Sequence, residues 1–300
     1  MQRSQWVGSF LVATALGCLL LTAAHSQLKA AKPAKLLKTT RQSSTDLEVS
    51  GLLAGVTSSS HRFIRYSDLL KLPQVKATIT GDENFADMHT ATVHVSGVSL
   101  EVLSRMIGVA PSATFITGLC TDEYLGIFSA DYLAAHQPIL VLKINDLSYA
   151  NWARKTHNQD PGPYLITSTK FTPAYHVLAY GEQPQVPENM VSLSFNAPQA
   201  LEAAIAPAAR FTSDSPQQLG FAIARVTCLK CHNVGDIGGT KAHRPWSKLI
   251  ADATADPATF AKRIANPKSV DPKAAMPANE AFDTATLAAL TAYFQSLSTE

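Results

Sequence analysis

The sequence predicts two folded regions of different class, an α+β domain over residues 45–196 followed by an all-α domain over residues 212–300. The chain has 300 residues, 46% of them hydrophobic, which suffices for about two domains of roughly 100–200 residues that each bury a core. In the first region, short β-branched and apolar runs alternate with short helical patterns. In the second region, apolar residues recur at helical spacing.

The formal net charge is only +2 and 16% of the residues are charged. These values exclude a disordered polyelectrolyte, a coiled coil and a basic nucleic-acid-binding protein. Residues 45–196 carry nine basic and fourteen acidic groups. This acidic excess fits either an ordinary solvated surface or a docking face for a redox partner, where complementary charge accelerates encounter.

The first 26 residues have the layout of a secretory signal peptide. Arg3 precedes the apolar run Phe10 to Leu21, and Ala24-His25-Ser26 supplies the small residues that a signal peptidase requires. We therefore expect cleavage after Ser26 and a periplasmic or otherwise exported protein. An uncleaved membrane anchor is the main alternative, whereas lipid attachment at Cys18 is disfavoured by the apolar residues that continue past it.

Two connecting segments are expected on composition. Residues 27–44 carry five basic groups and no acid, which predicts a basic, disordered tether. Residues 197–211 are expected to form the linker between the two domains.

The first domain is expected to contain strands and short helices. The predicted strands are Leu47–Leu53, Val75–Thr80, Thr90–Val95, Thr114–Leu119, Ile139–Ile144 and Tyr164–Thr167. The predicted helices are Ser67–Leu72 and Ser99–Ile107, each opened by a serine cap. No strand–helix unit carries a glycine-rich phosphate loop, so a nucleotide-binding fold has little support.

In the second domain, helical spacing predicts helices over residues 216–229 and Thr284–Leu297. Asp283 and Thr284 are both suitable caps for the latter.

The string Cys228-Leu229-Lys230-Cys231-His232 matches the C-x-x-C-H motif of covalent haem attachment. Two thiols on one helical turn can each add to a haem vinyl group, and the adjacent imidazole then faces the iron. A disulfide or a thioredoxin-like cysteine pair would use the two cysteines but would not require a histidine at position 232. A zinc site would need a fourth ligand, for which the region offers only His243. The motif therefore predicts one covalent haem c attached to Cys228 and Cys231, with His232 as an axial ligand.

Met276, in Ala275-Met276-Pro277, is the predicted second axial ligand. It follows His232 after a loop rich in proline and lysine, and the other methionines lie far from the motif in the sequence. A thioether is a soft, neutral donor that favours ferrous iron and raises the reduction potential. His243 is the alternative ligand.

Residues 212–300 resemble class I cytochrome c. Gly220 stands where that family packs its first helix against its last, and Leu290 and Tyr293 stand where the last helix provides its packing partners. Pro245 resembles the family proline whose carbonyl orients the proximal imidazole. Ala224 departs from the family, which often has an aromatic residue there. The resemblance implies a helical haem domain that transfers electrons.

Residues 45–185 resemble, more weakly, the molybdopterin-binding domain of the sulfite oxidase family. The segments that carry the resemblance are Leu47–Ala54, Asp68–Pro73, Gly97-Val98-Ser99-Leu100, Asp122-Glu123-Tyr124, Asn145-Asp146 and Gly162–Ile166. The resemblance implies the fold of that domain.

The family's molybdenum ligand is absent from this sequence. In the family, a cysteine in the strand before the Gly-Val-x-Leu helix binds molybdenum, but residues 77–83 contain no sulfur. Cys120 lies one strand later and is better explained as a small buried residue. The arginines that would bind a pterin phosphate are also sparse. We therefore expect a domain that has kept the fold without binding molybdopterin.

The sequence thus favours an exported monohaem electron carrier whose first domain docks a redox protein partner, rather than an enzyme in its own right. We expect no nucleic-acid partner, and no integral membrane domain once the signal is cleaved. One alternative is a sulfite-dehydrogenase-like molybdopterin oxidoreductase that passes electrons to its own haem. Another is a haem-based sensor or ligand binder, which would need a displaceable sixth ligand.

Overall fold

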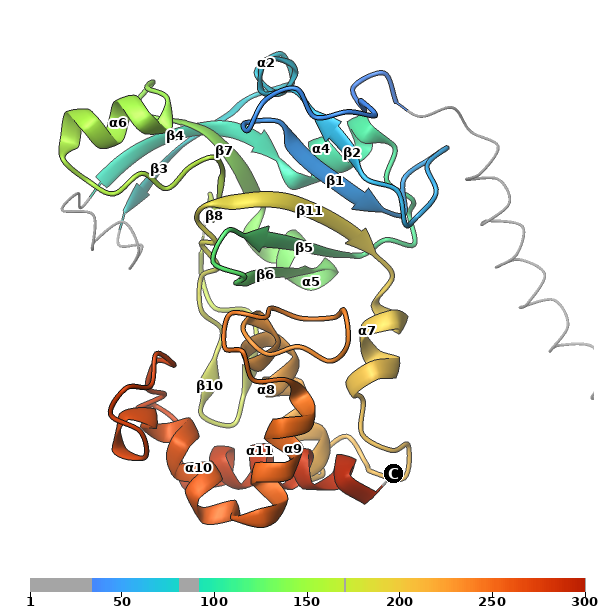
Figure 1. Cartoon of the computed structure of the whole chain (residues 1–300), viewed down its shortest axis with the longest axis vertical. Coiled ribbons are helices and arrows are strands. Elements are labelled where there is room, and N and C mark those ends of the chain that lie inside the picture. The colour runs from blue at the N-terminus through green and yellow to red at the C-terminus, as the bar shows by residue number, and fades with distance from the viewer. Residues whose placement is uncertain (1–33, 81–91, 170, 300) are drawn as a thin grey trace, which may run out of the picture.

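The structure is a computed structural model that describes residues 34–80, 92–169 and 171–299. Within these ranges the chain forms two β-sheets, a small hairpin and a group of helices (Figure 1). The expected mixture of sheets and helices is confirmed, because every described strand ends by residue 196 and the named elements after it are helices. The predicted signal peptide, residues 1–26, lies outside the described residues.

The first sheet has five strands in the order β2-β1-β11-β5-β6. Its strands are β1 (Leu47–Gly51), β2 (Arg62–Ile64), β5 (Phe115–Cys120), β6 (Leu125–Ser129) and β11 (Met190–Asn196). The β1–β11 pair is parallel and the other pairs are antiparallel. The sheet therefore joins the first strand of the chain to the last one before the helices.

The second sheet is antiparallel in the order β3-β4-β7-β8. Its strands are β3 (Val75–Thr80), β4 (Thr92–Ser99), β7 (Pro138–Ile144) and β8 (Leu165–Ser168). Strands β9 (His176–Val177) and β10 (Tyr180–Gly181) form a separate hairpin. All six predicted strands coincide with observed ones, whereas β2, β6, β9, β10 and β11 were not predicted.

Four short helices accompany the sheets: α2 (Tyr66–Leu69), α4 (Leu100–Ile107), α5 (Ala130–His136) and α6 (Tyr149–Thr156). The predicted cap of α4 is confirmed, because the Ser99 hydroxyl accepts a hydrogen bond from the Val102 amide. The predicted cap Ser67 is wrong. Helix α2 begins at Tyr66, and the carbonyl of Arg65 already accepts the amides of Asp68 and Leu69, so Ser67 lies inside the first turn.

The prediction of a disordered tether is wrong for residues 34–44. The backbone of Lys38 exchanges hydrogen bonds of 2.8 and 2.9 Å with that of Phe63, next to the edge of the first sheet. Leu37 is buried in the core under that sheet, and Arg41 pairs with Glu48 at 3.0 Å. An apolar side chain between the lysines thus fixes a segment whose charge suggested a solvated chain.

The predicted linker, residues 197–211, contains helix α7 (Pro198–Ile205). Leu201 and Ile205 are buried, and the Tyr293 hydroxyl donates to the Ile205 carbonyl at 2.6 Å. This segment is therefore packed against the helices that follow it.

Four longer helices make up the rest of the chain. They are α8 (Pro216–Thr227), α9 (Trp246–Ala255), α10 (Pro257–Ala265) and α11 (Thr284–Ser296), with 3₁₀ turns η1 (Cys228–Lys230), η2 (Pro267–Ser269) and η3 (Leu297–Thr299). Of the two caps considered for α11, Asp283 is the one observed, because its carboxylate accepts from the Thr286 amide at 2.8 Å. Helices α9 and α10 were not predicted.

Helices α8 and α11 cross in close contact at Gly220. A Cβ atom on Gly220 would overlap the carbonyl of Ala289 and would lie 2.7 Å from the Cβ atom of Tyr293. Leu290 and Tyr293 are buried in the same core. The predicted packing roles of Gly220, Leu290 and Tyr293 are therefore confirmed. Ala224 is fully buried, so a small side chain is accommodated at the position where the resemblance led us to expect an aromatic one.

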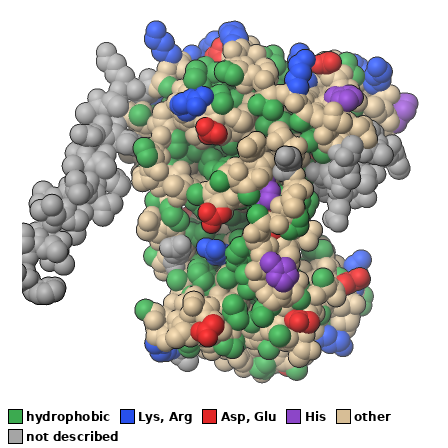
Figure 2. All heavy atoms as spheres, turned by 180° about the vertical axis from the view of Figure 1, so that it is seen from behind, with side chains coloured by type: hydrophobic (Ala, Val, Ile, Leu, Met, Phe, Trp, Pro, Cys, Tyr) green, Lys and Arg blue, Asp and Glu red, His purple; other side chains and the backbone are tan. Residues whose placement is uncertain are grey.

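The sheets and the helices share a core. Ile127 of β6 and Tyr180 of β10 belong to the same buried cluster as Trp246 and Phe294 of the helices. Two hydrogen bonds of 3.0 Å join the hairpin region to the helices. The Tyr175 hydroxyl donates to the Ala222 carbonyl, and the Ala179 amide donates to the Thr286 hydroxyl. Seen from behind, hydrophobic side chains line a hollow at this junction (Figure 2). None of the helices in the described ranges has the length and apolarity needed to cross a bilayer.

Candidate functional site

The C-x-x-C-H motif lies where helix α8 tightens into the 3₁₀ turn η1. The amides of Cys231 and His232 both donate to the Cys228 carbonyl, at 3.1 and 2.9 Å. In such a turn the side chains of residues i and i+3, here Cys228 and Cys231, lie on the same side. The two cysteines and the histidine are therefore brought onto one turn.

Both motif cysteines are free thiols. Burial raises the pKa of Cys228 to about 11 and also raises the pKa of Cys231 above its usual value. The Thr227 hydroxyl lies 3.6 Å from the Cys228 sulfur. Because both pKa values lie above neutrality, the cysteines are protonated at pH 7 and neither is poised as an exposed, reactive thiolate.

His232 is 9% exposed and is held by one hydrogen bond. Its Nδ1 atom lies 2.7 Å from the Arg244 carbonyl, and because a carbonyl can only accept, Nδ1 carries the proton. Burial lowers the pKa of His232, which favours the neutral ring. Among the described residues no hydrogen bond is made by Nε2, so its lone pair is free to bind a metal.

The prediction that Pro245 provides the orienting carbonyl is wrong by one residue. The Pro245 carbonyl accepts the amides of Lys248 and Leu249, because Pro245 is the N-cap of α9. The Trp246 amide donates to the Asn233 carbonyl at 2.7 Å, which holds the start of α9 against the segment after His232. A residue before proline is restricted to extended conformations, and in this arrangement it is the Arg244 carbonyl that reaches the imidazole.

The side chain of Arg244 is itself fixed. It pairs with Asp252 of α9, which also pairs with Lys248 at 3.0 Å and with Arg263 at 3.3 Å. Partial burial works against ionisation of Asp252, but the hydrogen bonds from Lys248 and Arg244 outweigh it and lower the pKa of that carboxyl. One carboxylate thus ties α9 and α10 to the residue that positions His232.

Met276 lies in the loop between η2 and α11 and is partly buried. It lines a hollow of about 270 Å³ formed by residues 266–278. The loop is fixed to the end of α10, because the Asn279 amide donates to Ala265 at 3.0 Å and its side chain donates to Ile264 at 2.8 Å. No hydrogen bond links Met276 to the motif within the described part of the chain. His243, the alternative ligand, is exposed.

A turn of the first sheet is clamped onto the segment that follows the motif. Lys241 pairs with Asp122 at 2.5 Å, and Thr240 donates to Glu123 through its amide at 3.1 Å and its hydroxyl at 2.7 Å. On the other side, the Ala242 amide donates to the Cys231 carbonyl at 3.0 Å. The sheet region therefore contacts the motif segment directly. Sequence reasoning missed this clamp, since opposite charges so far apart in the chain carry no local signal.

Cys120 is 3% exposed at the end of β5, and burial raises its pKa to about 12. The prediction that it is a small buried residue is confirmed.

The donor set on the motif turn fits a covalently attached haem. Two free thiols are available for thioether formation, and a neutral imidazole with a fixed tautomer offers Nε2 as an iron ligand. Cys228, Cys231 and His232 are the residues that would hold the group, with Met276 as the candidate for the opposite axial position.

No protein-family model matches the sequence, and no curated protein matches it. Among solved structures, the sulfane dehydrogenase SoxCD from Paracoccus pantotrophus is similar, with a TM-score of 0.35 and 16% sequence identity. The match covers 53% of this chain and 40% of that chain, so it spans less than half of the SoxCD chain.

Proposed function

We propose that the chain is an exported monohaem c-type cytochrome that transfers electrons, and that its sheet region is a docking or partner module. The observation that carries the proposal is the motif turn, where two free thiols adjoin a histidine whose Nδ1 is bonded to the Arg244 carbonyl. A thioredoxin-like pair would not need this oriented imidazole.

A haem bound here supplies a one-electron iron centre. The contribution of the chain is to attach it through Cys228 and Cys231 and to ligate it through His232. The hydrogen bond to the Arg244 carbonyl fixes the imidazole ring and increases its basicity as a ligand. Trp246, Tyr293 and Phe294 form the apolar core beside this turn, and an apolar surrounding tunes a redox centre by limiting solvent access.

Met276 is the proposed second axial ligand. Its loop is anchored to α10 through Asn279, so the methionine is held on a fixed segment. If His232 and Met276 both held the iron, no position would be left for a substrate or a sensed ligand, and the haem group would supply one-electron exchange with another redox protein.

The sheet region is proposed as a partner module and not as a catalytic domain. Its Cys120 is a buried residue of the core under the first sheet, and the sequence lacks a cysteine at the position where the sulfite oxidase family binds molybdenum. The clamp through Asp122 and Glu123 places this region against the motif segment. A partner bound to it would therefore lie close to the proposed haem.

The test is to express the full chain together with a haem-attachment system and to measure covalent haem in the exported protein. We expect one haem per chain, recognised by the pyridine haemochrome spectrum of a doubly thioether-linked group. Cys231→Ala should leave at most one thioether and a weakly held haem. Cys120→Ala is the matched control, because it removes a thiol outside the motif and should keep the full haem content.

A colourless wild-type protein from a host that loads another c-type cytochrome would overturn the proposal. So would undiminished, doubly linked haem in the Cys231→Ala protein.

A further inference from the structure

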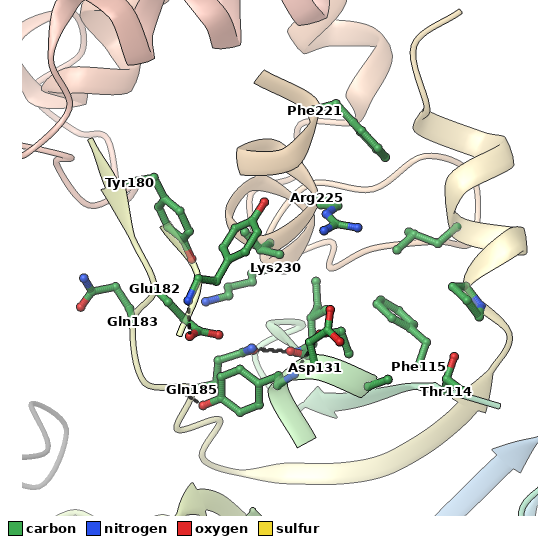
Figure 3. Close-up of a pocket in the computed structure, with 18 residues that line it drawn as sticks. Thr114, Phe115, Asp131, Tyr180, Glu182, Gln183, Gln185, Phe221, Arg225 and Lys230 are labelled. Atoms are coloured by element: carbon green, nitrogen blue, oxygen red, sulfur yellow. Dashed lines mark hydrogen bonds between the residues drawn. The ribbon is translucent and has the colours of Figure 1, made fainter. Parts of the chain in front are cut away.

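We propose that the cavity at the junction of sheets and helices binds a small organic anion, a monocarboxylate with a compact apolar body. The cavity has a volume of about 230 Å³. Its walls come from β5, β6 and α5, from the hairpin region, and from α7 and α8 (Figure 3). It is therefore built from both halves of the molecule.

Two cations enter this cavity from the helical side. Arg225 of α8 and Lys230 of η1 both line it (Figure 3). Neither forms an ion pair or a side-chain hydrogen bond with any residue that the structure describes, and Arg225 Nε is buried without a hydrogen-bond partner. The guanidinium lies 6.0 Å from the ring of Tyr175 and 5.9 Å from that of Phe221. A partly buried cation without an anionic partner favours binding of an anion.

Two carboxylates also line the cavity. One of them, Glu182, attracts Lys230 electrostatically and favours its charged form, whereas Arg225 has no such partner among the described residues. Glu182 Oε2 already accepts hydrogen bonds from the Ala174 amide at 2.8 Å, the Tyr175 amide at 3.1 Å and His136 Nε2 at 2.9 Å. Asp131 is exposed to solvent. Neither carboxylate forms a direct ion pair with Arg225 or Lys230 in the part of the chain that the structure describes. Arg225 therefore remains available to an incoming anion, while the charge of Lys230 is partly balanced by Glu182.

The other walls are partly polar, through Thr114, Ser129, Gln183 and Gln185, and otherwise apolar and aromatic. Phe115, Ile127 and Leu201 face the same space, and Ile127 and Leu201 belong to the core cluster shared by both halves. These walls favour a ligand with an apolar body over a bare inorganic anion. The cavity is smaller than the roughly 300–1,000 Å³ typical of pockets for drug-sized ligands, so the ligand is small.

The binding test is titration calorimetry on the full chain with benzoate as the probe. Benzamide is the neutral isostere, and sulfate carries charge without an apolar body. We expect saturable binding of benzoate, and at least about tenfold weaker binding of benzamide and of sulfate, as when a charged hydrogen bond or an apolar contact is lost.

Two variants test the assignment of the cations. Arg225→Gln and Lys230→Met should each weaken benzoate binding by at least about tenfold. Arg154→Gln and Lys273→Met are the matched controls, because both residues are exposed and lie outside the cavity. Their affinities should equal that of the unmodified chain. A cooperative thermal unfolding transition establishes that each protein is folded. If one cavity variant does not fold, the other variant and the comparison of benzoate with benzamide still test the anion site.

Absence of saturable benzoate binding overturns the inference, as does equal binding of benzamide or of sulfate, or unchanged affinity in the folded cavity variants. The measurement does not depend on haem. A colourless chain that binds benzoate would refute the proposed cytochrome function and support the proposed anion site. A haem-loaded chain that does not bind benzoate would support the cytochrome function and refute the anion site.

Discussion

At the scale of single residues, Asp252 connects the proposed haem ligand to the helical frame. It pairs with Arg244, Lys248 and Arg263, and the carbonyl of Arg244 holds His232. The side chain of Asp252 is only 18% exposed. A charge in this position is stabilising when its partners are present, and removing it leaves three cations close together without their anion.

Asp252→Asn should therefore lower the free energy of unfolding at pH 7 by about 1.5–3 kcal/mol, the range for hydrogen bonds to charged groups. Because the folded pKa of Asp252 is lowered, its contribution is complete above the unfolded pKa of about 3.9 and is lost as the pH falls through the folded pKa. Urea unfolding at pH 7 and at about pH 3 should show the difference between the two proteins shrinking in acid. Asp236→Asn, an exposed control, should show no effect at either pH, and a pH-independent loss in Asp252→Asn would contradict the prediction.

Met276→Ala should lower the reduction potential by more than about 100 mV, since axial ligands set haem potentials over a range of roughly 0.8 V. It should also open the sixth position, so that the ferrous protein binds carbon monoxide. Potentiometric titration and carbon monoxide difference spectra measure both effects. His243→Ala is the control and should change neither. If His243→Ala lowers the potential and allows carbon monoxide to bind while Met276→Ala does neither, His243 is the ligand.

The motif residues could be predicted from the sequence because their chemistry depends on side-chain type at fixed spacing. The acceptor for His232 could not be predicted correctly, because every residue has a carbonyl and only the folded backbone decides which one points at the imidazole. The sequence suggested Pro245, whereas Arg244 has the role. The cations in the cavity were missed for a similar reason, since Arg225 and Lys230 acquire a common environment only when α8 packs against the sheets.

At the scale of elements, the crossing of α8 and α11 defines the helical region. The absence of a side chain at Gly220 allows α8 to approach the backbone of α11 at Ala289. The same contact buries Leu290 and Tyr293. This close approach depends on a single residue without a Cβ atom.

Gly220→Ala should therefore destabilise the protein by about 1–3 kcal/mol, the usual cost of overpacking, although alanine is the better helix former by about 1 kcal/mol. Gly181→Ala is the matched control, because the nearest atom to its added Cβ would be His176 Cδ2 at 3.9 Å. Chemical denaturation of both variants measures the difference. Equal stability of the Gly220→Ala protein and the wild type would show that the helices can separate at no cost.

The elements that could be predicted are those with strong local patterns. Strands β3 and β7 alternate or are continuously apolar, and α11 has a long apolar face. Strand β11 was missed although it pairs with both β1 and β5, because its pairing partners lie far away in the chain. The composition of residues 34–44 predicts a tether because basic residues dominate it, but the burial of Leu37 determines the structure of this segment.

At the scale of the whole molecule, the two halves share one core cluster. They are also joined by the clamp at Asp122 and Glu123 and by the bonds of Tyr175 and Ala179. Because residues of both halves are buried in the same cluster, unfolding of one half would expose apolar surface of the other. We therefore expect the two predicted domains to unfold together.

We expect a single unfolding transition. Trp152 lies in the sheet region and Trp246 in the helical region, both fully or almost fully buried, so Trp152→Phe and Trp246→Phe proteins report mainly on opposite halves. Their fluorescence transitions in urea should coincide. Tyr180→Ala, which removes a buried contact with Phe282, should shift both transitions equally, by about 2–5 kcal/mol. Separate transitions, or a shift in only one half, would show independent domains.

The pairing of β1 with β11 has a consequence for folding. Strand β1 lies between β2 and β11 in its sheet, so the five-stranded sheet stays divided until residues 190–196 can pair with it. In a chain exported as we propose, these residues and the motif cysteines at 228 and 231 become available only after they have crossed the membrane. Closure of the sheet and attachment of the thiols then belong to the same compartment.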